Sequence, residues 1–145
     1  PRCAGYTAYR QSRCIIPAKG FGESEFQNGK PLHYHDFVAE ENEAIAFGGL
    51  YRQWRHGQTG EMATSCSIIT LPPHPKLERF HSKSMPLILP PDPNLWRAWL
   101  NPHIHNVEQF APLLSPHLPQ DLMVQQIDKP SHYRPLSEPV LIHAD

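Results

Sequence analysis

The sequence predicts a mainly β fold with a few small helices. Short runs of β-branched and aromatic residues recur along the chain, and glycine, proline or asparagine bounds most of them. The pair Asn28-Gly29 lies between two such runs and favours a tight hairpin, because both residue types accept positive φ angles. The 17 prolines crowd the C-terminal half and exclude long helices there. A chain of 145 residues is long enough for one domain with its own core, so we expect residues 1–145 to form a single domain.

Five runs carry the strand pattern. The hairpin at Asn28-Gly29 predicts antiparallel pairing between the segment around Glu23 and the run that follows, which brings Glu23 into the sheet. The expected strands are residues 14–16, 32–38, 44–51, 64–71 and 86–89.

Helical patterns are few and short. Within residues 94–100, Trp96, Trp99 and Leu100 share one helical face at i, i+3 and i+4, so both tryptophans are expected in the core. Asn106 stands just before the third and is a residue type that caps helices. The expected helices are residues 76–80, 94–100 and 107–114. Beyond Asp128, residues 129–135 predict a loop and residues 140–143 a last edge strand or a tail.

The charge balance gives no general support for nucleic-acid binding. The net charge is −1 and the pI is near 6.9, whereas nucleic-acid-binding domains are usually basic. The distribution is uneven, since four cations precede the first acid, Glu23. This basic N-terminal segment would suit phosphates, and scattered surface charge is the alternative interpretation. Its cations are Arg2, Arg10, Arg13 and Lys19.

The cysteines indicate a reducing environment. Cys3, Cys14 and Cys66 are odd in number and widely spaced, which argues against a disulfide framework and a zinc knuckle. We expect Cys14 and Cys66 to be buried. The sequence shows no signal-peptide pattern and no apolar run near the roughly 20 residues that span a bilayer. A cytoplasmic protein without membrane contact is therefore expected.

Two motifs each place one ionisable group beside an apolar strand pattern. Residues 13–23 end in Glu23, directly after Gly20-Phe21-Gly22, and residues 81–89 begin with His81. A desolvated carboxylate and an imidazole can both exchange protons near neutral pH, so Glu23 and His81 could share a site. From the local sequence alone, an exposed hairpin acid and a structural histidine are the alternative interpretations. Glu25 is the alternative acid, since it lies two residues further on the same side of a strand.

Both motifs resemble those of the SOS-response-associated peptidase (SRAP) family. Residues 13–23 are similar to a family motif that begins with Arg-Cys and two hydrophobic residues. This motif continues with Pro-Ala-Asp-Gly-Phe and ends with an aromatic residue followed by Glu-Trp. Residues 81–89 are similar to its Ile-His-x-Arg-Met-Pro followed by a hydrophobic run. Other similar stretches occur in the family's order and extend the resemblance over most of residues 10–128. They are residues 30–34, 46–54, 67–70 and 95–100.

The resemblance implies an α+β fold, with a mainly antiparallel, strongly bent and barrel-like sheet and short peripheral helices. It also implies binding of single-stranded DNA and protection of its abasic sites by a covalent thiazolidine crosslink to an N-terminal cysteine. Glu23 and His81 would move the protons, and Glu23 would assist removal of the initiator methionine, a self-processing peptidase activity. No cofactor and no metal are expected, and the protein is expected to be a monomer encoded by a bacterium or phage. The DNA-binding residues would be Arg13, Phe21, Trp54, Thr70 and Lys83.

The departures from the family concern the nucleophile. Family members open with Met-Cys-Gly-Arg, whereas this chain starts at Pro1 and reaches the first motif within about a dozen residues. We therefore expect it to be the C-terminal part of an SRAP-like domain without the nucleophilic cysteine, with Cys3 as a faint match to the family's opening. Lys19, Gly22 and Ser24 also depart from the family pattern, and one extra residue separates His81 from the following Met-Pro.

Two other functions stay open from the sequence. The chain would be a catalytically silent interaction module if it kept only the fold. It would be a metal-dependent hydrolase if its ten histidines built a metal site. His33 and His35 share one face of an extended strand, but neither they nor His103 and His105 have a third ligand at a recognised spacing.

Overall fold

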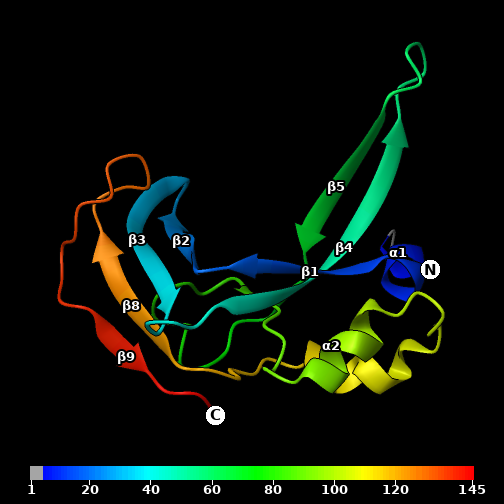
Figure 1. The fold of residues 1–145 in the computed structure, drawn as a ribbon. Helices are drawn as coiled ribbons and strands as arrows, with labels where there is room; N and C mark the ends of the chain where they lie inside the picture. The colour runs from blue at the N-terminus through cyan, green and yellow to red at the C-terminus, as the bar shows by residue number, and fades with distance from the viewer. Residues whose placement is uncertain (1–4) are drawn as a thin grey trace.

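The computed structural model describes residues 5–145 and shows a mixed α/β fold built mostly from antiparallel sheets (Figure 1). The strands are β1 (Arg13–Ala18), β2 (Gly20–Gln27), β3 (Lys30–Ala39), β4 (Ile45–Arg55), β5 (Met62–Ile68), β6 (Thr70–Leu71), β7 (Met85–Pro86), β8 (Leu122–Ile127) and β9 (Val140–Ile142). The helices are α1 (Tyr6–Gln11), α2 (Pro93–Leu100) and the 3-10 helix η1 (Val107–Leu114). The strands form three sheets with the orders β1-β4-β5, β2-β3-β8-β9 and β6-β7.

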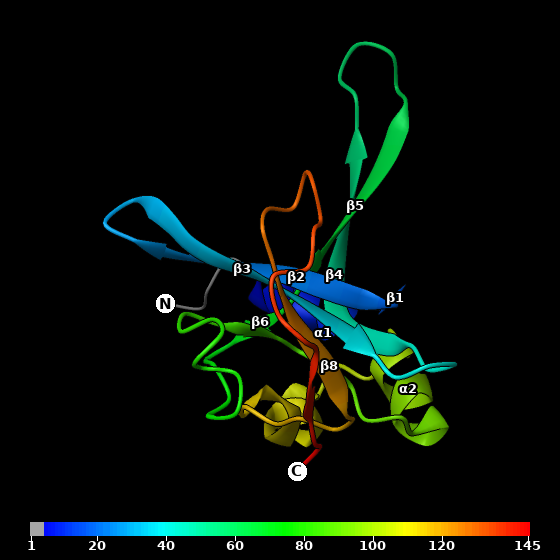
Figure 2. The same ribbon diagram turned by 90° about the vertical axis from the view of Figure 1, so that its left-hand side faces the viewer.

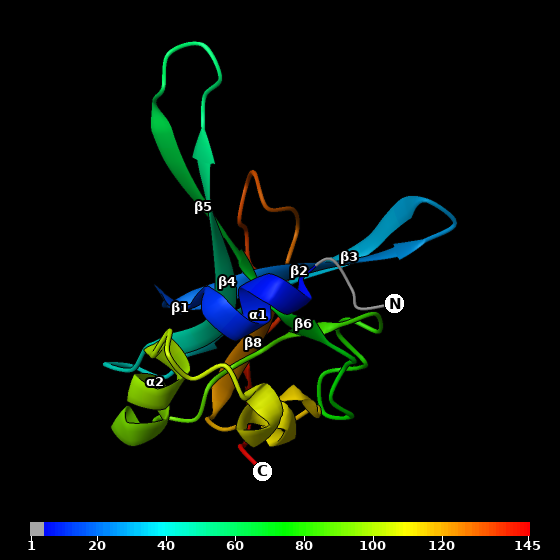
Figure 3. The same cartoon turned by 90° about the vertical axis from the view of Figure 1, so that its right-hand side faces the viewer.

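Consecutive strands of the chain connect the two larger sheets, and the chain bends where it passes from one sheet to the other. β1 passes into β2 across the single residue Lys19, and β1 pairs with β4 whereas β2 pairs with β3. The Ala39 amide donates to the Lys19 carbonyl at 2.9 Å, so the hydrogen-bond ladder continues through the corner. The turned views show how strongly the strands change direction there (Figures 2 and 3). This bend agrees with the strongly bent antiparallel sheet that the sequence predicts.

The β4–β5 hairpin projects from the body of the molecule in all three views (Figures 1 to 3). Every residue of β5 is exposed, and so are the last four residues of β4. The first half of β4 is buried instead, because it crosses the core. The hairpin is therefore an arm with its base in the core and its tip in solvent.

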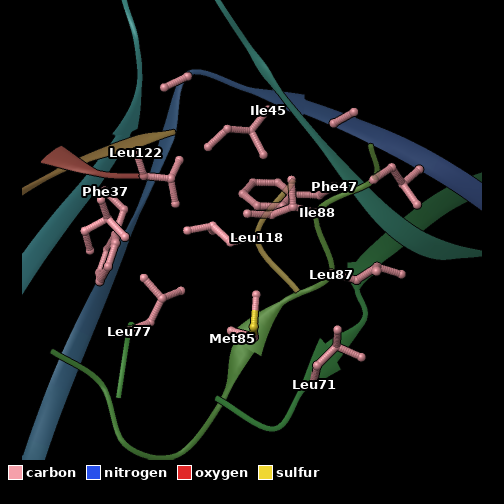
Figure 4. Packing of buried hydrophobic residues seen from close by; sticks show 14 of the residues in the cluster. Phe37, Ile45, Phe47, Leu71, Leu77, Met85, Leu87, Ile88, Leu118 and Leu122 are labelled. Carbon is pink, nitrogen blue, oxygen red and sulfur yellow. The ribbon is translucent and has the colours of Figure 1, made fainter. Parts of the chain in front are cut away.

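One hydrophobic cluster lies beneath the bent sheet. Phe37 from β3 and Phe47 from β4 lie in this cluster with Leu118 and Met85, as the close-up shows (Figure 4). The helical side of the cluster contributes Trp99, which is fully buried, and Phe110, whose ring lies 5.2 Å from that of Trp99. Each such side chain stabilises the fold by about 1.5–3 kcal/mol through burial. Among residues 5–145, no helix combines the length and hydrophobicity needed to cross a membrane.

Most predicted elements are confirmed. Asn28 and Gly29 have φ angles of 52° and 75°, and the β2–β3 hairpin turns on them. The helices at 94–100 and 107–114 appear as α2 and η1, and the Asn106 side chain accepts from the Glu108 amide at 3.2 Å. Residues 140–142 form the edge strand β9, paired with β8.

Several elements differ from the prediction. The strand expected at 86–89 is shorter, because β7 ends at Pro86, and the strand expected at 64–71 is divided into β5 and β6. The helix expected at 76–80 is wrong, because the segment forms consecutive turns in which the His74 carbonyl accepts from Leu77 and Glu78. Helix α1 and strand β8 are additional elements that the sequence patterns did not indicate. β8 lies between β3 and β9, so the predicted edge strand depends on it for its place in the sheet.

Gly20 is required at the corner between β1 and β2. A Cβ at this position would lie 2.3 Å from the Phe37 carbonyl oxygen, which is fixed in the β2–β3 ladder. We expect Gly20→Ala to lower the free energy of unfolding by about 2–3 kcal/mol. Gly22→Ala is the matched control, because its Cβ would meet only the His35 carbonyl oxygen at 3.9 Å. Urea denaturation of both variants measures the difference, and equal midpoints would refute the close approach at Gly20.

Candidate functional site

Strand β2 presents its two acidic residues on the same face. Side chains alternate along a strand, so Glu23 and Glu25 point the same way as Phe21. Across the ladder Glu23 pairs with His35 and Glu25 with His33. His81 directly follows the turn-rich segment 74–80 and begins the short loop that leads into β7.

The structure brings His81 between the two carboxylates. Its Nε2 lies 3.4 Å from Glu23 Oε2, and its Nδ1 lies 3.3 Å from Glu25 Oε2. Only 10% of the His81 side chain is exposed, against 24% for Glu23 and 16% for Glu25. The contact at Nδ1 lacks hydrogen-bond geometry, so this buried nitrogen has no hydrogen-bond partner. The predicted neighbours Glu23 and His81 therefore meet, and Glu25 is a third member of the cluster as well as an alternative to Glu23.

The environment shifts the pKa values of Glu23 and Glu25 in opposite directions. Burial raises the pKa of Glu23 above its ordinary value; the nearby His81 opposes this shift and the negative charge of Glu25 adds to it. Hydrogen bonds from the side chain and backbone of Ser82 lower the pKa of Glu25. Near neutral pH, Glu25 is therefore the anion of the cluster, and Glu23 is the carboxyl group more able to hold a proton.

Two more histidines border the cluster from β3. The rings of His33 and His35 meet edge to face at 4.7 Å, and His35 also lies against Phe80 at 5.0 Å. Burial, with His33 as a second cause, lowers the pKa of His35 to about 4, so His35 is neutral at neutral pH. Among the described residues, no group of three or more His, Cys, Asp and Glu side chains is arranged to hold a metal ion. The absence of a metal stays a prediction.

A hollow of 510 Å³ lies on the other face of β2 and β3. Gly20, Gly22 and Ser24 line it, and these residues alternate along β2 with the side chains that face His81. Tyr34 and Asp36 line it from β3 in the same way. Glu23 and His35 also line the hollow, so it borders the strand residues that carry the carboxylate–histidine cluster.

Arg13 has a structural position that differs from its predicted role in DNA binding. It is 5% exposed, and its guanidinium donates five hydrogen bonds to the carbonyl groups of Tyr9, Arg10, Trp99, Asn101 and Ile104. A guanidinium has five N–H donors, so none is left for a phosphate. Arg13 instead ties α1 to the end of α2 and the loop after it.

The other cations of the N-terminal segment also bind carbonyl groups. Arg10 donates to His105, and Lys19 donates to Glu40 and Glu43. Arg2 lies outside the described residues. In the described part of the N-terminal segment, the positively charged side chains therefore bind backbone carbonyl groups of other segments.

The remaining predicted DNA-binding residues occupy different surroundings. Phe21 stacks on Phe37 with centroids 4.7 Å apart and packs against the core, so its ring is partly buried. Trp54 is 50% exposed on the β4–β5 arm, with the Arg52 guanidinium 4.5 Å above its ring. Thr70 is exposed on β6. Lys83 is exposed in the loop that begins at His81.

The cysteines differ from one another. Cys14 is half-buried, and burial raises the pKa of its thiol. Cys66 is exposed, so its predicted burial is wrong, because β5 is the outer strand of the projecting arm. Cys3 lies outside the described residues.

Comparisons with known proteins match most of the chain. The family model described as SOS response associated peptidase (SRAP) matches residues 6–130. The abasic site processing protein YobE of Bacillus subtilis strain 168 is 33% identical over 115 residues, which are 79% of this chain and 51% of that protein. The abasic site processing protein YoqW of Bacillus phage SPbeta is 31% identical over 115 residues, which are 79% of this chain and 50% of that protein.

Solved structures share the fold. A crystal structure of a protein from Bacteroides thetaiotaomicron superposes with a TM-score of 0.69 at 23% identity, covering 85% of this chain and 52% of that one. A protein from Bordetella bronchiseptica gives a TM-score of 0.65 at 22% identity, covering 85% and 58%. The chain spans about half the length of the curated relatives it matches. On the family match and the identity to these relatives, the chain belongs to the SRAP family.

Proposed function

We propose that this chain binds single-stranded DNA at abasic sites and supplies the acid–base groups for a covalent crosslink there. The observation that carries the proposal is the position of His81 between Glu23 and Glu25 in a member of the SRAP family. The names of its relatives, abasic site processing proteins, support the substrate.

The crosslinking reaction needs protons at several steps. The ring-opened abasic sugar carries an aldehyde at C1′, and the α-amine of a cysteine adds to it to give a carbinolamine. Loss of one water molecule gives the Schiff base, and addition of the cysteine thiol to its C=N bond closes the thiazolidine. A proton must reach the departing hydroxyl group, and protons must leave the amine and the thiol.

Glu23 and His81 have the right properties for these transfers. Glu23 holds a proton more readily than an ordinary carboxyl group, because burial raises its pKa. It can therefore protonate the departing hydroxyl group, and His81 beside it can take up or return the proton. The same pair would serve the self-processing step that frees an N-terminal cysteine.

The thiazolidine requires an amine and a thiol on adjacent carbon atoms, which only an N-terminal cysteine provides. In a polypeptide prepared as residues 1–145, Cys3, Cys14 and Cys66 are all internal. We expect this polypeptide to form no denaturation-resistant adduct with an abasic oligonucleotide. A shifted protein band on a denaturing gel would contradict this expectation and would direct attention to Cys3.

Binding to DNA is expected to be weak and sensitive to salt. The chain has a net charge of −1, and Lys83 lies beside the site while Trp54 offers an exposed ring on the arm. We expect a Kd of about 10⁻⁴–10⁻⁶ M for single-stranded DNA, little dependence on sequence, and weaker binding as salt rises. Fluorescence anisotropy with abasic, intact and duplex oligonucleotides at two salt concentrations measures these differences.

Two substitutions test the contacts. Trp54→Ala is expected to cost about 1–3 kcal/mol of binding if a base stacks on the ring. Lys83→Gln is expected to reduce the slope of log K against log salt by about 0.7, with Lys129→Gln in the exposed loop after β8 as its control. Equal affinity for abasic and intact strands, unchanged by either substitution, would favour the silent interaction module.

The acid–base groups can be tested separately from the N-terminal cysteine. Cysteinamide carries the required amine and thiol, so its condensation with an abasic oligonucleotide forms the same thiazolidine ring. The rate of this condensation in the presence of residues 1–145, followed by mass spectrometry of the oligonucleotide, reports proton transfer by the protein.

A further inference from the structure

We propose that Glu25 and Ser82 form a clamp that positions His81 for proton transfer with Glu23. The inference rests on the proposed function and adds two positioning residues to it. Glu25 Oε1 accepts from Ser82 Oγ at 2.5 Å, and Glu25 Oε2 accepts from the Ser82 amide at 3.0 Å. One carboxylate thus holds both donors of the residue that directly follows His81.

The clamp fixes a loop to a strand that is distant in sequence. Glu25 belongs to β2, whereas Ser82 lies 57 residues later in the loop before β7. Hydrogen bonds to an ionised acceptor are stronger than neutral ones, and two of them from one residue also set its orientation. The clamp therefore fixes the backbone next to His81 at the position along β2 where His81 Nε2 faces Glu23 Oε2.

Glu25 also completes the electrostatic surroundings of His81. Its Oε2, which holds the Ser82 amide, lies 3.3 Å from the buried Nδ1 that has no hydrogen-bond partner. A small rotation of the ring would turn this contact into an N–H···O bond that fixes the orientation of the ring. Glu25 thus orients His81 while Glu23 exchanges the proton at the opposite nitrogen.

The other ionisable groups around the ring are few. From β3, His33 and His35 face the cluster, and His35 is neutral at neutral pH. Lys83 is exposed in the loop, and the Arg79 guanidinium lies over the Phe80 ring at 4.6 Å. Glu23 and Glu25 are therefore the acidic side chains that contact the His81 ring in the described part of the chain.

The substitution Glu25→Gln removes the charge and keeps the shape and an acceptor oxygen. We expect it to lower the cysteinamide rate at saturating DNA by about tenfold and to leave the Kd for DNA unchanged. We also expect the alkaline limb of the pH–rate profile to move to lower pH, because the negative charge of Glu25 contributes to the raised pKa of Glu23. Ser82→Ala should lower the rate less, because the Ser82 amide still binds Glu25.

Matched controls separate this effect from a general loss of charge or of a hydroxyl group. Glu78→Gln removes an exposed carboxylate three residues before His81, and Ser84→Ala removes a hydroxyl group in the same loop. Neither should change the rate or its pH profile. A Glu25→Gln protein with the wild-type rate and profile would overturn the positioning role.

The clamp has a readout that does not depend on activity. The Ser82 amide is bonded to Glu25 although its residue is exposed, so its hydrogen exchange should accelerate about tenfold in Glu25→Ala. Unchanged exchange would refute the clamp. A wild-type chain that fails to accelerate the condensation would contradict the proposed function, and the exchange of the Ser82 amide would then decide the clamp alone.

Discussion

Replacing Arg13 with alanine is expected to lower the free energy of unfolding by about 3–4 kcal/mol. The guanidinium donates to five carbonyl groups in α1, at the end of α2 and in the loop that follows. It also lies 4.9 Å from the centroid of the Phe110 ring, so the substitution removes packing as well as hydrogen bonds. The carbonyl groups left without donors would have to recruit water beside the core.

Two companion variants identify the cause of that loss. Arg13→Lys keeps the charge but offers three donors from one point, so it should recover only part of the stability. Arg52→Ala removes an exposed arginine from β4 and should change stability by about 0.5 kcal/mol or less. Urea denaturation followed by tryptophan fluorescence compares all three. An Arg13→Ala midpoint equal to that of Arg52→Ala would show that Arg13 is free for another role, including a phosphate contact.

Substitutions at Glu23 and His81 are expected to have the largest effects on chemistry. Glu23→Gln and His81→Asn should each lower the cysteinamide rate by about 10²-fold, the range of a single acid–base group. The two residues act on the same proton, so the double variant should be little slower than either single variant. Glu78→Gln, an exposed carboxylate nearby, is the control and should keep the wild-type rate.

The pH dependence follows from the shifted carboxyl group. Burial raises the pKa of Glu23, so its protonated form persists to a higher pH than for an ordinary glutamate. The Glu23 contribution to the rate is therefore present at low pH and is lost as pH rises through this raised pKa. A profile for Glu23→Gln that keeps this loss would assign it to another group.

Local chemistry made much of the fold predictable. Asn28-Gly29 set the hairpin and the β2–β3 register, and the spacing of Trp96 and Trp99 identified the buried face of α2. The segment 76–80 carries apolar residues at Leu77 and Phe80, as one helical turn would. However, the backbone bonds form two separate turns instead of a helix. The His74 carbonyl accepts from Leu77 and Glu78, and the Leu77 carbonyl accepts from Phe80 and His81.

The features that the sequence did not predict depend on contacts between segments that are distant in sequence. Arg13 is indistinguishable from an exposed cation in sequence, and only the meeting of α1 and α2 supplies carbonyl groups for it. Cys66 lies in an apolar pattern, yet its strand forms the outside of an arm. β8 contains two consecutive polar residues, Gln125 and Gln126, which interrupt its apolar run and hid its strand pattern. The pairing of Glu23 with His81 was predictable through the family motifs, whereas the contact between Ser82 and Glu25 depends on how the loop folds back.

The most direct test of the proposed function is the initial rate of cysteinamide condensation with a single-stranded abasic oligonucleotide. The rate is compared with residues 1–145, with the double variant Glu23→Gln, His81→Asn, and without protein. The account predicts that the wild-type chain accelerates the condensation at the abasic site and that the double variant does not. A wild-type rate equal to the rates of the double variant and of the reaction without protein would contradict it.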